Sequence, residues 1–208
     1  AVDNAGNIGE NSTATSFRVD VTKPSTPTNI SPANGENTND NTPLLDWSDS
    51  TDISTPITYR LYVDNDSNFS SVDYSQSGLT SSQYQFTSEL AEKVWYWRAC
   101  AVDNAGNIGE NSTATSFRID VTAPGKPTLV SPENNGTTYD NTPTFVWTEP
   151  ETPENYTLVI DNDADFGSPI QTITSITDNT YWLTTELSNG IYYWRVREID
   201  QAGNLGEW

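Results

Sequence analysis

The sequence predicts an all-β protein made of tandem seven-stranded β-sandwiches. Short segments of alternating apolar and polar residues, separated by turn residues, recur along the chain, and no segment keeps the i, i+3, i+4, i+7 apolar spacing of a helix. The sequence also repeats after about 100 residues, the usual size of one such sandwich. Finally, 7 Trp, 10 Tyr and 6 Phe supply apolar mass for small cores in a chain whose single cysteine excludes an internal disulfide.

The repeat defines the predicted domains. The segment AVDNAGNIGENSTATSFRVDVT at 1–22 returns at 101–122 with one change, Val19 to Ile119, and a more diverged copy, EIDQAGNLGEW, occupies 198–208. The bodies between these copies match as well, so each copy marks the same place in the repeat. We therefore expect residues 1–23 to be the last strand of a preceding repeat, 24–123 to be a complete repeat, and 124–208 to be a repeat that lacks its last strand.

Turn residues and prolines set the limits of the strands in the complete repeat. Asn34-Gly35 and Ala105-Gly106-Asn107 are turn signals between strands. The predicted strands are 27–31, 43–47, 58–63, 70–75, 83–86, 94–102 and 113–121. Proline-rich linkers, TKPSTP at 22–27 and TAPGKP at 122–127, restrict the backbone and should hold successive repeats at a limited range of angles.

The sixth predicted strand carries aromatic residues of the core. Successive side chains of a strand point to opposite faces, so one alternating set faces inward and the other faces solvent. The inward set is Trp95, Trp97, Ala99 and Ala101, and the outward set is Tyr96, Arg98 and Cys100. Each buried aromatic side chain is worth roughly 2–3 kcal/mol, which a sandwich without disulfides needs. We interpret Cys100 as a tolerated free thiol, because Arg197 holds its position in the second repeat.

Several positions together resemble a known family. Trp47 and Trp147 lie in the second strand of their repeats, Leu90 and Leu187 precede the sixth strand, and Tyr192 stands at a tyrosine-corner position. With the runs YYWRVREIDQAGN and SFRID, the whole chain is similar to fibronectin type III-like repeats of the immunoglobulin type, found in bacterial and archaeal surface proteins, extracellular filaments and secreted hydrolases. This resemblance implies spacers, filament units or binding modules. The first repeat departs from it, because Trp95 replaces the corner tyrosine.

Charge and composition exclude several functions. The chain has 29 Asp and Glu against 9 Lys and Arg, a net charge of −20, which opposes binding to nucleic acid or to an anionic membrane. No apolar run is long enough to span a bilayer. The absence of histidine removes Ser-His-Asp and Cys-His catalysis and most zinc sites. We expect no enzyme, because nothing places two carboxylates in a cleft as a glycosidase requires.

The predicted strand at the start of the chain has no sandwich of its own. Phe17 and Val19, with Thr15 beside them, point toward a core that the first 23 residues do not contain, while the second repeat should have an open groove with an unpaired edge. Two interpretations stay open. These residues belong to a longer covalent array, or separate copies join head to tail by donating this strand to a neighbour.

Two kinds of surface site are predicted. Sequons for N-linked glycans occur at Asn11, Asn29, Asn65, Asn68, Asn111, Asn135 and Asn155, and Asn11 and Asn111 rank first as the same repeat position. If glycans occupy them, the chain is extracellular, and a glycosylating archaeon is a natural source. Carboxylates at i, i+2 and i+4 make calcium candidates of Asp161, Asp163 and Asp165, and of Asp64 and Asp66 in the equivalent loop. An Asx-rich turn explains the same spacing, and the 103–107 loop has the same ambiguity.

We therefore expect an extracellular structural unit of a filament, stalk or surface layer, whose partners are copies of itself arranged head to tail. One alternative is an adhesin or carbohydrate-binding segment that recognises surface glycans. Its candidate aromatic platform is Tyr96, Tyr139, Trp182 and Tyr193, although such residues more often cover a sheet face or contacts between repeats. Another alternative is that the repeats are spacers of a secreted hydrolase.

Overall fold

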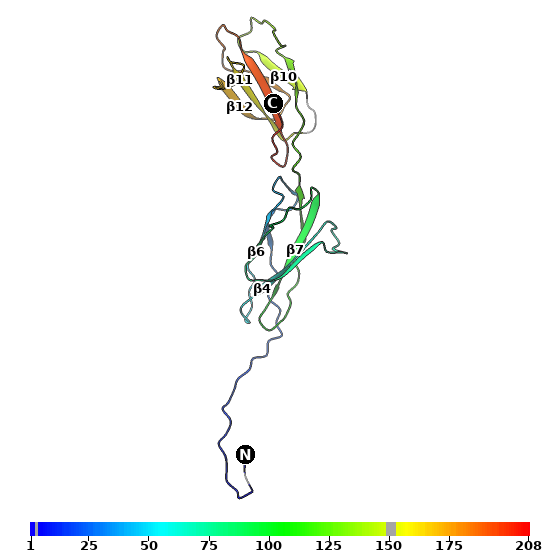
Figure 1. The fold of residues 1–208 in the computed structure, drawn as a ribbon, viewed down its shortest axis with the longest axis vertical. Coiled ribbons are helices and arrows are strands. Elements are labelled where there is room, and N and C mark those ends of the chain that lie inside the picture. The colour runs from blue at the N-terminus through cyan, green and yellow to red at the C-terminus, as the bar shows by residue number, and fades with distance from the viewer. Residues whose placement is uncertain (3, 149–152) are drawn as a thin grey trace.

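The computed structural model describes residues 1–2, 4–148 and 153–208 of the chain. Its shape is elongated: an extended N-terminal segment leads into one β-sandwich, and a second sandwich follows beyond it (Figure 1). No helix occurs in the described residues. The all-β fold class predicted from the alternating segments is therefore confirmed.

The first sandwich contains eight strands in two sheets. Its strands are β1 (Asn29–Ser31), β2 (Glu36–Thr38), β3 (Leu44–Trp47), β4 (Thr58–Asp64), β5 (Tyr74–Leu79), β6 (Gln83–Gln85), β7 (Val94–Val102) and β8 (Thr115–Ile119). One sheet has the order β1-β3-β6 and the other β2-β8-β7-β4-β5. Every pair is antiparallel except β2 and β8, which run parallel.

The strand positions follow the predicted pattern with two differences. The fourth predicted strand, 70–75, forms later as β5, because residues 66–70 are held in a turn by the Asp66 carboxylate, which accepts the backbone N–H of Asn68 at 3.0 Å. The short strand β2 was not predicted, since Glu36-Asn37-Thr38 shows no apolar alternation. Its pairing depends on the neighbouring strand β8 and not on its own side chains.

The core of the first sandwich is aromatic. Trp47 and Trp97 are fully buried, and the ring of Tyr59 meets that of Trp47 edge-on at 5.6 Å between centroids. Leu90, which precedes β7, is buried in the same core. The residues of β7 expected to face inward are all buried: Trp95, Trp97, Ala99 and Ala101.

Cys100 corrects one prediction. The alternation of β7 places this thiol on the outer face of the sheet, yet only 3 % of the residue is exposed. Cys100 pairs with Arg60 across the strands and has Arg98 two residues before it on the same face. The apolar stems of such long side chains can cover a smaller neighbour on a sheet face. Burial raises the pKa of Cys100, and the two guanidinium groups oppose that rise only in part.

The second sandwich repeats this plan with six strands. They are β9 (Thr128–Ser131), β10 (Thr144–Thr148), β11 (Asn155–Asp161), β12 (Gln171–Ile176), β13 (Thr180–Trp182) and β14 (Tyr193–Ile199), in sheets β13-β10-β9 and β12-β11-β14. Its core forms a separate cluster that includes Trp147, with Leu187 packed against its edge. Within the described residues, β11 is the one strand paired with β14, and a bridge from Ile199 to Leu205 is its one further pairing.

The aromatic corner occurs in both sandwiches. The Tyr192 hydroxyl donates a hydrogen bond to the Ser188 carbonyl, four residues earlier, at 3.0 Å. In the first sandwich, where tryptophan replaces tyrosine, the Trp95 indole N–H donates to the Ala91 carbonyl at 3.0 Å. The two aromatic side chains therefore make the same i to i−4 connection with different donor atoms.

Candidate functional site

The extended segment 13–21 and the open edge of β14 are the first candidate site. In the first sandwich, β8 fills the position beside β7 in the register Trp95 with Phe117, Tyr96 with Ser116 and Trp97 with Thr115. Phe117 and Ile119 then lie in the core with no exposed surface. Residues 13–21 carry almost the same sequence as 113–121.

The same side chains are solvent-exposed in the N-terminal segment. Phe17 is 90 % and Val19 is 75 % exposed, and Thr15 is exposed beside them. No residue of 9–28 is in a strand. The backbone of 13–19 therefore does not make the ladder of hydrogen bonds that β8 makes in the first sandwich. The structure thus places all three predicted inter-subunit residues on a segment outside any sheet.

The second sandwich shows the complementary feature. At the positions of Trp95 and Trp97, which are buried under β8, the second repeat has Tyr192 and Trp194, and both are only half-buried. Ile191 is 74 % exposed at the start of the same edge. The sheet edge at Tyr192 and Trp194 is therefore less covered than the equivalent edge of the first repeat, which lies under β8.

Three carboxylates meet where the N-terminal segment enters the first sandwich. The carboxylate oxygens of Asp20, Asp52 and Asp103 all lie within 4.8 Å of one another. A hydrogen bond from the Ser54 hydroxyl and another from the Thr22 N–H lower the pKa of Asp20. Burial raises the pKa of Asp103, but hydrogen bonds from Asn107, Ala105 and Gly106 outweigh it, so the net shift is downward. Asp20 and Asp103 are therefore both charged at neutral pH.

The predicted calcium residues form turns. Asp161 accepts the backbone N–H groups of Asn162 at 2.7 Å and Asp163 at 3.4 Å, and Asp165 accepts that of Gly167 at 2.7 Å. In the first repeat Asp64 accepts the N–H of Asp66 at 3.1 Å. Among the described residues, the carboxylates that converge are those of the Asp20 cluster and not those of these loops. Calcium binding by Asp64, Asp66, Asp161, Asp163 and Asp165 stays a prediction.

A stacked arginine fixes each of these loops. The Arg98 guanidinium lies 4.1 Å from the ring centre of Phe69, and Arg195 lies 4.2 Å from that of Phe166. Both phenylalanines have positive φ, 53° and 57°. The cation–π contact in each repeat holds a strained turn against the outer face of the sheet. The same arginine–phenylalanine contact thus recurs in the equivalent loops of both repeats.

The sequons divide by exposure. Asn29 lies between the sheets, and its amide nitrogen donates to Thr115 Oγ1 at 2.8 Å and to the Trp97 carbonyl at 3.2 Å. A glycan on that nitrogen would displace these bonds, so this sequon is disfavoured. Asn155 is half-buried in β11. The remaining sequons are exposed, namely Asn11, Asn65, Asn68, Asn111 and Asn135.

The exposed aromatics do not share one sheet. Tyr139 is fully exposed and Trp182, in β13, is 72 % exposed. Tyr193 lies in β14 of the opposite sheet, and Tyr96 is half-buried in β7 of the first sandwich. Tyr139 occupies the repeat position of Asn39, whose amide lies 3.8 Å from where a Cβ on Gly203 of the second sandwich would stand. That position favours a contact between repeats over a sugar platform.

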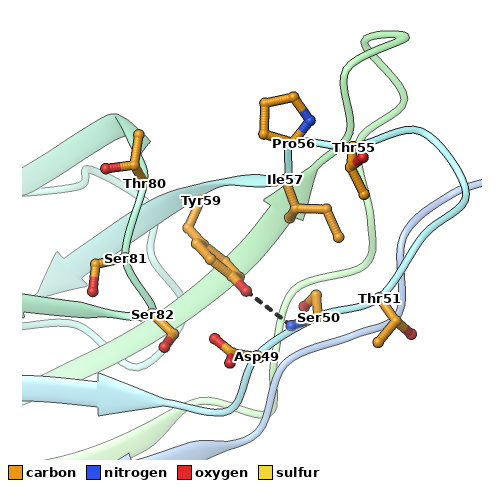
Figure 2. A pocket seen from close by; sticks show the side chains of 10 residues that line it. All are labelled: Asp49, Ser50, Thr51, Thr55, Pro56, Ile57, Tyr59, Thr80, Ser81 and Ser82. Atoms are coloured by element: carbon orange, nitrogen blue, oxygen red, sulfur yellow. Dashed lines mark hydrogen bonds between the residues drawn. The ribbon is translucent and has the colours of Figure 1, made fainter.

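A shallow hollow lies at one end of the first sandwich. Its volume is about 650 Å³ and it is lined mostly by hydroxyl groups (Figure 2). Tyr59 Oη accepts the Ser50 N–H there at 2.8 Å, and Asp49 is the one carboxylate among the lining residues. One carboxylate does not provide the acid–base pair of a glycosidase.

No helix among the described residues is long and apolar enough to cross a membrane.

Comparisons with known proteins agree with this architecture. No protein-family model and no curated protein sequence matches the chain. Solved structures do match. The fibronectin(III)-like modules of CbhA from Clostridium thermocellum align with a TM-score of 0.58 at 15 % identity, covering 87 % of this chain and 89 % of that one. The FN1–FN3 domains of chicken CNTN1 align with a TM-score of 0.53 at 14 % identity, covering 92 % and 67 %. The fold is therefore fibronectin III-like.

Proposed function

We propose that this chain is a structural repeat unit of an extracellular filament, stalk or surface layer, in which each sandwich is completed by a strand of the 13–21 type. The observation that carries the proposal is the contrast between two nearly identical segments. Phe117 and Ile119 are buried in β8, whereas Phe17 and Val19 are exposed, and β14 has the vacant edge that β8 occupies beside β7.

The first sandwich supplies the register of the proposed contact. Phe17 would lie opposite Tyr192 as Phe117 lies opposite Trp95, and Thr15 would lie opposite Trp194 as Thr115 lies opposite Trp97. Burying the exposed side chains of Phe17 and Val19 would stabilise the contact by roughly 1.5–3 kcal/mol each, and covering the half-buried aromatics would add less. Main-chain hydrogen bonds along the edge would fix the register.

A covalent array and strand donation both fit this geometry. In a covalent array the strand comes from the next segment of the same chain, and in strand donation it comes from residues 13–21 of another copy. Either arrangement is head to tail and does not close on itself, so it extends into a fibre. The net charge of −20 would keep such fibres hydrated and apart.

Self-association of this 208-residue chain tests strand donation. We expect its mass by light scattering after size-exclusion chromatography to rise with protein concentration. The substitution Phe17→Asp should abolish that rise, because it puts a charge on the inserted face. The matched substitution Ser16→Asp adds the same charge on the alternate face and should have a smaller effect. A chain that stays monomeric at every concentration would contradict donation and leave the covalent array.

An adhesin or carbohydrate-binding role is the second candidate. It is favoured by Trp182, which replaces Gln85 of the first repeat and exposes a large aromatic face. Binding of the chain to a glycan array, lost in Trp182→Ala, would support this role. The fibronectin III-like fold also suits a spacer in a secreted hydrolase, and a catalytic domain elsewhere in a longer protein would support that alternative.

N-linked glycans and bound calcium are two further parts of the same proposal. Glycans at Asn11 and Asn111 would mark an extracellular protein from a glycosylating archaeon, and intact mass before and after deglycosylation tests them. Calcium at the Asp161 and Asp64 loops would raise the melting temperature at millimolar calcium, and an unchanged melting temperature would count against it.

A further inference from the structure

Two hairpins of the same sequence type lie where the chain enters each sandwich. Asp103-Asn104-Ala105-Gly106-Asn107 follows β7, and Asp200-Gln201-Ala202-Gly203-Asn204 follows β14. Each hairpin is closed by a bridge, Val102 with Ile108 and Ile199 with Leu205. Each also turns at a glycine with positive φ, 94° at Gly106 and 87° at Gly203, which only glycine adopts readily.

The aspartate of each hairpin holds the asparagine in place. Asp200 Oδ1 accepts the Asn204 backbone N–H and Asp200 Oδ2 accepts the Asn204 side-chain amide, both at 2.8 Å. Asp103 makes the same two bonds to Asn107, also at 2.8 Å. An amide nitrogen has two hydrogens, so one stays available for another acceptor.

The second hydrogen of this amide is donated to a backbone carbonyl that lies just before the proline-rich linker. Asn204 Nδ2 donates to the Asp120 carbonyl at 2.8 Å, and Asn107 Nδ2 donates to the Asp20 carbonyl at 3.2 Å. Asp20 and Asp120 are the same repeat position, at the end of the SFRVD and SFRID segments. The hairpin of each sandwich therefore contacts the chain at the point where it leaves this segment before the proline-rich linker.

A second glycine brings the linker proline close. A Cβ on Gly206 would lie 3.2 Å from the Pro124 carbonyl oxygen, and one on Gly109 would lie 3.0 Å from that of Pro24. Both distances are shorter than ordinary carbon–oxygen contacts. Glycine at this position lets the linker backbone lie directly on the hairpin.

The junction between the two sandwiches has further contacts across it. Asn37 Nδ2 of the first sandwich donates to Gln201 Oε1 of the second hairpin at 3.1 Å. On the first-sandwich side, the Asp120 N–H donates to the Thr38 carbonyl at 3.0 Å. Asp120 is thus bound by β2 through its N–H and by the next hairpin through its carbonyl.

We propose that the Asp-x-Ala-Gly-Asn-x-Gly segment is a clamp that binds the Asp-Val-Thr-x-Pro linker of the preceding repeat and fixes the orientation of successive sandwiches. The clamp contacts the main chain of the linker in two ways. One asparagine amide donates a hydrogen bond to it, and one glycine packs closely against it. The clamp acts within a single chain, so it holds whether or not copies associate through strand donation.

Residual dipolar couplings test the clamp on the 208-residue protein. Rigidly joined sandwiches share one alignment tensor, and we expect this in the unmodified chain. In Asn204→Ala the second sandwich should lose that common alignment, because the bond to the Asp120 carbonyl is removed. Asn107→Ala loses the equivalent side-chain bonds, to Asp103 and to the Asp20 carbonyl. Neither bond joins the two sandwiches, so these should stay aligned together. This matched pair separates loss of the junction from general damage.

Gly206→Ala provides a second test that removes no hydrogen-bonding group. Its added methyl should displace Pro124 and again abolish the common alignment, whereas Gly109→Ala should not. Slow exchange of the residue 206 amide, which donates to the Glu198 carbonyl at 2.9 Å, reports that the hairpin stays closed. A common alignment that persists in both Asn204→Ala and Gly206→Ala would overturn the clamp.

Discussion

The aromatic corners show how one hydrogen bond can be kept while the residue changes. Tyr192 and Trp95 reach the carbonyl four residues earlier with a hydroxyl and with an indole N–H, respectively. The resemblance to fibronectin III-like repeats predicted the bond at Tyr192 and gave no reason to expect it at Trp95. Donor geometry explains the outcome, because both side chains place a polar hydrogen at the far edge of a flat ring.

Removing the corner hydroxyl should destabilise the second sandwich. We expect Tyr192→Phe to lower its free energy of unfolding by about 1 kcal/mol, since one partly exposed hydrogen bond is lost without a cavity. Urea denaturation followed by the tryptophan fluorescence of this sandwich would measure the change. Equal stability of Tyr192→Phe and the unmodified chain would show that the corner bond contributes nothing.

Acid should release the first clamp. The pKa of Asp103 is lowered in the folded protein, so its hydrogen bonds to Asn107 stabilise the hairpin above the ordinary carboxyl pKa. That stabilisation is lost as the pH falls below about 4, through the lowered pKa. Asp20 and Asp52 face the same carboxylate, and Asp20 titrates in the same low range because its pKa is also lowered.

The side-chain amide resonances of Asn107 report this transition. They should keep their positions from neutral pH to about pH 4 and shift together below it. A shift centred well above the ordinary carboxyl range would contradict the assignment of Asp103 as the acceptor.

At the scale of the strands, the alternation of apolar and polar residues predicted most strand positions of the first repeat. Six of the seven predicted strands of the first repeat formed near their expected positions. In β3, β4, β7 and β8 alternate side chains are buried in the core. β5 formed late, since the carboxylate of Asp66 holds the preceding residues in a turn. β2 has no apolar pattern and is paired through its backbone, so a sequence signal for it does not exist.

The part of the candidate site that occurs twice in the sequence could be predicted from it. Comparing 13–21 with 113–121 was enough to single out Phe17 and Val19, and the structure shows both exposed. The clamp was missed, because the spacing of Asp103 to Asn107 is equally typical of a turn or a metal loop. The decisive partner, the Asp20 carbonyl, is 87 residues away in the chain and carries no side-chain signal.

For the chain as a whole, stability and shape have different sources. The two aromatic cores are separate clusters, so each sandwich is stabilised largely by its own buried residues. The junction contributes few contacts, and its role is geometric: β2 and the next hairpin bind the same linker residue. In an array of such units, the number of repeats would set the length, and the clamp would set the orientation of each sandwich relative to the next.

Binding of the isolated strand to the open edge of β14 tests whether a strand of the 13–21 type completes the second sandwich. A synthetic peptide with the sequence of residues 13–21 would be titrated into the 208-residue chain while amide resonances are recorded. We predict that the amides of residues 191–194 shift and become protected from exchange, with no change at 94–97, which β8 already covers. The same peptide with aspartate in place of the phenylalanine should not bind. If the first peptide leaves residues 191–194 unaffected at millimolar concentration, completion of the sandwich by this strand is contradicted.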